Sequence, residues 1–209
     1  MIQIFDFKEY VNNGWGGYED LLASLKDAFG ERVENGINFP VYFLDVEGLK
    51  KEIQDMTTIV AVETDNNELI GTVSIKFCKD RKSERYVFHK HVAVASFAKR
   101  QGVGSLLLKE VIRIAKETGV DYIRSGTSVN AKSSVKWHEK NGFKKVGLVA
   151  APGRDYYSYV FRYQINPNSR FNSSIYCYFQ YMKWNIWVRL TKKKGGNPTM
   201  FWRLFYNKK

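Results

Sequence analysis

The chain has 209 residues and a formal net charge of +12, and this length is enough to fill one hydrophobic core. Its two cysteines, Cys78 and Cys177, exclude a disulfide framework and a cysteine metal cluster, so we expect a reducing, cytoplasmic setting and no bound metal. The first ten residues lack the apolar run of a signal peptide, and no stretch approaches the roughly 18 apolar residues of a membrane span. The composition therefore predicts no membrane partner.

The charge is distributed unevenly along the chain. All 21 acidic residues lie within residues 1–155, so this part is close to neutral. Residues 156–209 contain Lys and Arg but no Asp or Glu. Such an asymmetry marks a compositional boundary. We therefore expect an enzyme-like domain over residues 1–165 and a basic, aromatic-rich C-terminal extension over residues 166–209.

Hydrophobic periodicity and turn residues predict the elements of the first 165 residues. In chain order we expect strand 2–7, helix 18–28, helix 45–53, strands 58–64, 69–77 and 86–94, helix 105–118, strand 122–129, helix 131–141, and strands 143–149 and 156–165. Asp45 is placed to cap the second helix, and Asp65-Asn66-Asn67 is a hairpin signal. This order predicts an α/β (α+β) fold with a mixed, mostly antiparallel sheet flanked by helices.

The C-terminal extension shows an alternation that is typical of strands. Trp184, Ile186, Val188 and Leu190 occupy every second position, which predicts a strand over 183–192, followed by a loop and a second strand over 200–206. A β-rich extension is therefore expected. Because an isolated hairpin is marginal in water, its apolar face would pack against the body or a second subunit, which leaves a homodimer open. The alternative is that the extension is accidental and has no selected role.

The segment from Lys99 to Ser105, with the sequence Lys-Arg-Gln-Gly-Val-Gly-Ser, lies between the apolar run 91–94 and the helix expected over 105–118. A strand, a glycine turn and a helix together form an anion site, because several peptide N–H groups and the helix dipole then point at one phosphate. The segment is neither a P-loop nor a G-x-G-x-x-G fingerprint. It predicts a cradle for a pyrophosphate.

A second motif follows, where Asn130 opens the helix expected over 131–141 and residues 138–143 read His-Glu-Lys-Asn-Gly-Phe. In this order and at this separation, the two motifs resemble those of the GNAT superfamily of acetyl-CoA-dependent N-acetyltransferases, over roughly residues 57–165. The resemblance implies a GNAT-like fold, acetyl-CoA as the co-substrate, and a primary amine of a small molecule or a peptide as the acceptor.

The resemblance also implies which residues would hold acetyl-CoA. The backbone groups of Val92 and Val94 would pair with the pantetheine arm, and a backbone amide of the same strand would face the thioester oxygen. The remaining residues implied in the cofactor site are Lys99, Arg100, Gln101, Gly102, Val103, Gly104, Ser105 and Asn130.

Candidate catalytic residues follow from the needs of acetyl transfer to an amine. Many relatives carry a Tyr general acid at the position of His138, and an imidazole can protonate a thiolate, so His138 is the candidate acid. The alternative is that His138 only packs or hydrogen-bonds. For the general base, His89 and His91 lie on the strand expected over 86–94. Strand parity places both on the face opposite to Val92 and Val94, which is the side that the resemblance implies for the acceptor. A β-bulge would reverse that parity, but a core or surface histidine is the favoured interpretation, and a water relay to a distant acid is the other alternative for the base.

Two other functions stay open at the level of sequence. Lys and Arg interleaved with aromatic residues in the extension suit base stacking and phosphate contacts, as in a nucleic-acid-binding module. The extension matches no recognisable nucleic-acid-binding motif, so the sequence disfavours a nucleic-acid partner. The second alternative is a non-catalytic regulator that binds acetyl-CoA.

Overall fold

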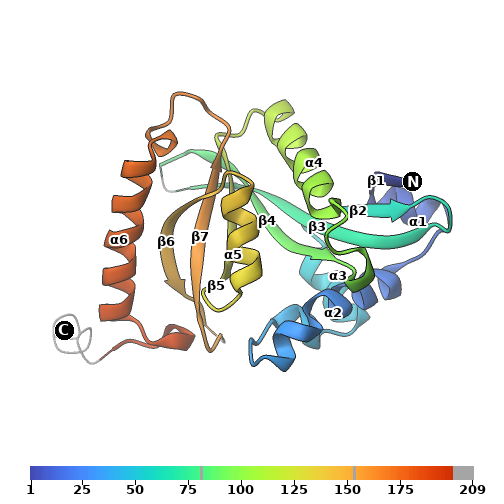
Figure 1. Ribbon diagram of the computed structural model, residues 1–209, viewed down its shortest axis with the longest axis horizontal. Coiled ribbons are helices and arrows are strands. Elements are labelled where there is room, and N and C mark those ends of the chain that lie inside the picture. Colours follow the sequence, from blue (N-terminus) through green and yellow to red (C-terminus); the bar gives the residue numbers. More distant parts are fainter. Residues whose placement is uncertain (81, 153, 200–209) are drawn as a thin grey trace. The chain divides into compact units, whose positions relative to one another are not determined.

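The structure is a computed structural model, and it describes residues 1–80, 82–152 and 154–199. The chain forms two compact units, Met1–Ile123 and Arg124–Lys209 (Figure 1). Each unit combines strands with helices that cover them. The domain boundary expected near residue 165 concerns composition, and it stays a prediction.

The strands of the first unit are β1 (Ile2–Asp6), β2 (Thr57–Glu63), β3 (Glu68–Lys79) and β4 (Arg85–Val94), and they lie side by side in the order β1-β2-β3-β4. Each neighbouring pair is antiparallel. The β2–β3 hairpin turns where the sequence predicts it, and Asn67 takes a φ of 57° there, a conformation that Asn tolerates better than most residues.

Four helices of the first unit are α1 (Phe7–Asn12), α2 (Tyr18–Glu34), α3 (Val46–Ile53) and α4 (Val103–Glu117), with short 3₁₀ turns η1 (Pro40–Phe43) and η2 (Ser96–Ala98). Asp45 caps α3 as predicted, because its Oδ1 accepts a hydrogen bond of 2.7 Å from the Gly48 amide. Helices α2 and α3 pack on one face of the strands. That core includes Leu21, Leu25, Leu49, Ile53, Val60, Val62 and Ala93.

Helix α4 covers the other face of the same strands, and Gly71 of β3 allows its close approach. A Cβ atom on Gly71 would lie 2.7 Å from Val103 Cγ1 and 3.2 Å from Leu107 Cδ1, both on α4. Real Cβ atoms do not approach other atoms so closely, so only glycine lets the first turn of α4 sit at this depth.

The second unit contains β5 (Tyr122–Ser128), which begins at the boundary, together with β6 (Lys144–Ala150) and β7 (Tyr157–Gln164), in the order β5-β7-β6. Its helices are α5 (Lys132–Lys140) and α6 (Ser174–Thr191), with 3₁₀ turns η3 (Arg170–Asn172) and η4 (Lys194–Gly196). Strands β6 and β7 are antiparallel. Helix α6 runs along β6 (Figure 1).

The predicted fold class is confirmed as a mixed α/β fold with mostly antiparallel strands and flanking helices, but the predicted β-rich extension is wrong. Residues 183–191 lie in helix α6, and the predicted strand over 200–206 lies outside the described residues. The Ser173 side chain caps α6 by accepting a hydrogen bond from the Tyr176 amide.

The inward side of α6 explains why this segment is a helix. Cys177, Val188 and Thr191 are buried, and Tyr181 places its ring 5.9 Å from that of Tyr159 on β7. These positions follow helical spacing. Twelve of the 18 residues of α6 are apolar or aromatic, so the same sequence also satisfies a two-residue alternation. Contact with β6 therefore decides the structure.

Within the described ranges, no helix combines the length and apolar character needed to cross a bilayer.

Candidate active site

A β-bulge interrupts the pairing of β3 with β4. Ser74 pairs with Lys90, whereas Thr72 pairs with Ala93, so β4 carries one residue more than β3 between these pairs. His91 lies in this bulge with a φ of 52°. Bulge residues leave the regular ladder, and the alternation of faces shifts by one beyond them. Beyond the bulge, the residues of β4 therefore face the opposite side of the sheet from the one that simple alternation predicts.

The bulge separates the two histidines of β4. Cross-strand partners share a face of the sheet. His89 pairs with Ile75, on the face that carries Gly71 and is covered by α4, and it is buried. His91 instead contacts Glu52 on α3, on the opposite face. The bulge thus places His89 on the face of Val94, where it is a core residue, whereas His91 lies on the opposite face and is directed toward the N-terminal helices.

Glu52 forms a small charged cluster with two residues of β4. Its Oε1 lies 3.5 Å from His91 Nε2 and accepts a hydrogen bond from Lys90 Nζ. The His91 side chain is 7% exposed. The hydrogen bond from His91, with further help from Lys90, lowers the pKa of Glu52 to about 2. Glu52 is therefore a carboxylate at neutral pH, and it favours a protonated imidazole beside it. No sequence pattern marks Glu52 as a site residue, because its partner His91 is distant in the chain.

The lowered pKa of Glu52 makes a prediction about acid stability. Because the folded-state pKa is depressed from the ordinary Glu value of 4.5, the ionised side chain stabilises the protein above that pH, and this contribution is lost as the pH falls toward about 2. Glu52 is half exposed, so we expect Glu52→Gln to lower the free energy of unfolding at pH 7 by about 1 kcal/mol at most. Thermal melts at pH 7 and pH 3 measure this. A stability gap that does not shrink at pH 3 would contradict the assignment.

The turn between β4 and α4 has the geometry of an anion site. Arg100 and Gly102 have φ angles of 69° and 86°, and Gly102 is the N-cap of α4. The amides of Ser105 and Leu106 both donate to the Gly102 carbonyl, at 2.9 and 3.0 Å. The amides of Val103 and Gly104 stand in the first turn of α4, where a helix offers no acceptor, and the described residues supply none elsewhere.

The side chains around this turn differ in their surroundings. Val103 is buried against β3, so only its backbone is available to a ligand. Lys99 Nζ lies 3.5 Å from Glu31 Oε2 on α2 in an exposed ion pair. Gln101 Nε2 donates to the Phe97 carbonyl at 3.2 Å. Arg100 is exposed and, among the described residues, has no acidic partner. A cation and several amides are therefore available at the start of α4.

The other two predicted site residues lie in the second unit. Asn130 is exposed in the turn before α5, and its amide donates to Ser128 Oγ at 3.1 Å. His138 is buried on α5: its Nδ1 donates to the Ser134 carbonyl at 2.7 Å, and its Nε2 shares a 2.8 Å hydrogen bond with the Ser125 hydroxyl. Its ring stacks on Phe161 with centroids 4.5 Å apart. This geometry favours the packing alternative that the sequence left open.

The predicted residues from Val92 to Ser105 are thus assembled within the first unit, on one strand, one turn and one helix start. The part of the chain that the structure describes holds no group of three or more His, Cys, Asp or Glu side chains placed to bind a metal.

The class of protein follows from this arrangement and from a comparison with family models. A model of the acetyltransferase (GNAT) family matches residues 20–143, which is more than half of the chain. The chain belongs to this family of acetyltransferases.

Solved structures show the same fold. A ribosomal-protein-alanine N-acetyltransferase from Brucella melitensis has a TM-score of 0.58 and 20% sequence identity, with 78% of this chain and 99% of that chain covered. The Salmonella typhimurium protein yncA, solved with its cofactor acetyl-CoA, has a TM-score of 0.56 and 17% identity, with 80% and 96% covered. At such identities the likeness shows the fold alone, and it confirms the GNAT-like architecture. A search of curated proteins found no match.

Proposed function

We propose that the protein transfers the acetyl group of acetyl-CoA to a primary amine of a small molecule or a peptide. The observation that supports this best is the bulged strand β4 followed by the Gly102 turn and the amides of the first turn of α4, for which the described residues supply no acceptor. Bound there, acetyl-CoA would supply a reactive thioester. The similar structure solved with acetyl-CoA, and the one named for acetylation of a ribosomal protein alanine, support this cofactor and this class of acceptor.

In this proposal the first unit binds the cofactor through its backbone. The amides of Gly102, Val103 and Gly104 donate to the pyrophosphate, and the positive end of the α4 dipole and the Arg100 guanidinium add attraction. Lys99, Gln101 and Ser105 line the same turn. Val92 is one of the bulge residues that have no partner in β3, so its backbone is available to the pantetheine arm together with that of Val94. Asn130 remains a further candidate for cofactor binding.

Deprotonation of the amine is assigned to His91. An alkylammonium with a pKa near 10.4 is not a nucleophile, so the ammonium must lose a proton before its nitrogen attacks the thioester carbon. His91 is directed toward the face that α2 and α3 cover, and Glu52 stabilises the imidazolium that forms. The N–C bond forms, the C–S bond breaks, and CoA leaves as a thiolate that takes up a proton.

The proposal is tested with the full chain. Calorimetry with acetyl-CoA should show binding, and a panel of amines and peptides with free N-termini should include at least one that releases free CoA. Absence of acetyl-CoA binding would overturn the proposal. Binding without turnover on any amine would instead favour the second candidate, a non-catalytic regulator.

The role of His138 in the departure of CoA stays a prediction, and one variant separates its two alternatives. A general acid at this position would make His138→Phe lower kcat by roughly 10²–10⁴-fold without a change in acetyl-CoA affinity. The buried hydrogen bonds of His138 to Ser125 and Ser134 favour a different outcome, in which the variant unfolds at a lower temperature. Ser125→Ala serves as the control, since it removes one of these bonds and leaves the imidazole in place. An unchanged melting temperature for both variants would argue against the packing role.

A further inference from the structure

Helix α6 carries apolar side chains on the side that faces away from β6. Ile175, Phe179, Ile186 and Leu190 are between 46% and 71% exposed. At ~100° per residue they fall within a sector of about 60°, opposite the buried Cys177. We call these four residues the outer stripe. Since Cys177, Val188 and Thr191 are buried on the inner side, α6 is apolar on both sides.

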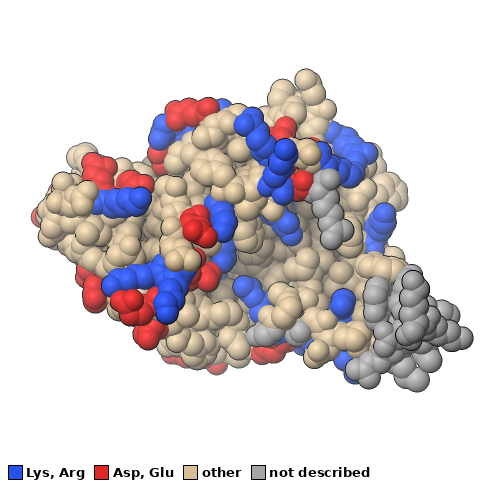
Figure 2. All heavy atoms as spheres, turned by 180° about the vertical axis from the view of Figure 1, so that it is seen from behind, with Lys and Arg blue, Asp and Glu red and all other residues tan. Residues whose placement is uncertain are grey.

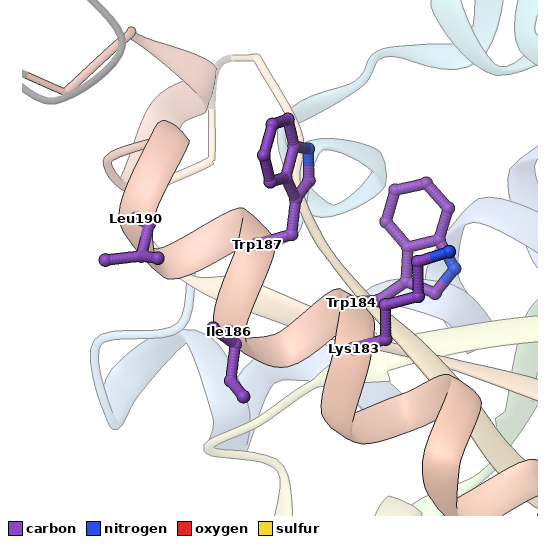
Figure 3. Close-up of a pocket in the computed structure, with 5 residues that line it drawn as sticks. All are labelled: Lys183, Trp184, Ile186, Trp187 and Leu190. Atoms are coloured by element: carbon purple, nitrogen blue, oxygen red, sulfur yellow. The ribbon is translucent and has the colours of Figure 1, made fainter. Parts of the chain in front are cut away.

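Such a helix is normally covered on both sides, because a surface helix usually turns a polar face to water. Beside the outer stripe lies a hollow of about 460 Å³, lined by Lys183, Trp184, Ile186, Trp187 and Leu190. In Figure 3 the rings of Trp184 and Trp187 point to one side of α6, whereas Ile186 and Leu190 project from its other sides. The Trp187 ring thus lies beside the outer stripe, whereas Trp184 lies against Gly147 of β6, on the inner side of α6.

The charges around the outer stripe are all positive. By helical spacing, Lys183 lies just beyond one edge of the outer stripe and Arg189 just beyond the other. Lys193 and Lys194 follow the end of the helix, and all four side chains are exposed. Beyond Ile123 the sequence contains only two acidic residues, Glu139 and Asp155, and both precede α6. Figure 2 shows the contrast, with Asp and Glu concentrated over the first unit. The partner of this surface is therefore anionic as well as apolar.

We propose that α6 lies along an anionic membrane surface, with the outer stripe in the boundary between headgroups and acyl chains and the flanking cations among the headgroups. Interfacial helices combine an apolar stripe with Lys and Arg in this way, and Trp and Tyr favour the same depth because one end of each ring is apolar and the other polar. Trp187 and Tyr178 occupy the two edges of the outer stripe. Because the other side of α6 packs on β6, the helix lies on the bilayer and does not cross it. The proposal therefore departs from the prediction of no membrane partner, which rested on the lack of a membrane span and did not consider binding to a membrane surface.

The charge pattern separates this partner from two others. A second copy would bring two positive surfaces together with no acidic residue in either extension, and the two would repel. The phosphates of a nucleic acid would pair with the Lys and Arg side chains, but the outer stripe would stay exposed to water. An anionic bilayer satisfies both features at once.

The test uses the full chain and two kinds of vesicle, one of phosphatidylcholine alone and one with a third of its lipid replaced by phosphatidylglycerol. Co-sedimentation should show at least tenfold stronger binding to the anionic vesicles, weakened by added salt. The double variant Phe179→Ser, Ile186→Ser should lose at least tenfold of this affinity. Phe43→Ser is the matched control, because Phe43 is 63% exposed and Phe179 65%, and it should bind like the unmodified chain. Circular dichroism checks that both variants retain their helices.

Three outcomes would overturn the proposal. The first is equal binding to both kinds of vesicle, or none to either. The second is a dimer in sedimentation velocity that the double variant abolishes, which would make a second copy the occupant. The third is tighter binding to a labelled single-stranded oligonucleotide than to the anionic vesicles, with no effect of the double variant.

Discussion

Replacing Gly102 by Val is expected to abolish acetyl-CoA binding. Gly102 has a φ of 86°, a conformation that a β-branched residue adopts only with strain of order 1–3 kcal/mol. Apart from its neighbours along the chain, no atom of the described residues lies within 4 Å of the position that its Cβ would take. The new side chain would therefore project into open space beside the amides that we assign to the pyrophosphate. We expect the affinity measured by calorimetry to fall at least about 100-fold, beyond detection.

Gly36 offers a matched control for this variant. Its φ is 76° and the space around its Cβ position is also open, but it lies in the turn after α2. Gly36→Val should therefore lower thermal stability to a similar extent and leave acetyl-CoA binding intact. Normal binding by Gly102→Val would refute the assignment of the turn.

His91→Gln is expected to lower kcat by roughly 10²–10⁴-fold, the range for a lost general base, with little change in acetyl-CoA affinity. Glutamine keeps a hydrogen-bonding side chain near Glu52 but cannot accept the amine proton at neutral pH. Only a neutral imidazole can accept the amine proton, so kcat/KM of the unmodified protein should rise with pH, and the part of this rise that is due to His91 should disappear in the variant. Steady-state kinetics over pH 5–9 with the amine found in the panel measure both effects.

Lys90→Met is the control for this experiment. It removes the other cation that contacts Glu52 and leaves His91 in place, so kcat should stay within a few-fold of the unmodified protein. If His91→Gln also retained its kcat and its pH profile, the proton would leave by another path, and a water relay to a distant acid would be favoured.

Local sequence signals were sufficient to predict much of the first unit and the turn over residues 99–105 that we assign to the cofactor. The Asp45 side chain caps α3 by accepting a hydrogen bond from nearby backbone, and Asn67 turns the hairpin because Asn tolerates its positive φ. In both cases a single stretch of sequence contains the whole cause. The turn at Gly102 is a similar case, since a glycine between a strand and an amphipathic helix is a local pattern.

The features that sequence could not supply depend on distant partners. The bulge at His91 exists because β4 has one residue more than β3 between two cross-strand pairs, and no alternation within β4 reveals that count. Glu52 approaches His91 from α3, a helix far away in the sequence. The segment of α6 satisfies both strand and helix periodicities, so packing on β6 decides between them.

The missing side chain of Gly71 has a consequence for ligand binding, although Gly71 lies on β3 and not in the turn between β4 and α4. The contact of Val103 with Gly71 sets how closely the N-terminal end of α4 approaches β3. The amides of the same helical turn move together with Val103. A methyl group at Gly71 would push the N-terminal end of α4 away from β3 and displace all of these amide donors together. Chains that carry alanine at this position should accordingly carry a smaller residue than valine at position 103, so the two positions are expected to vary as a pair.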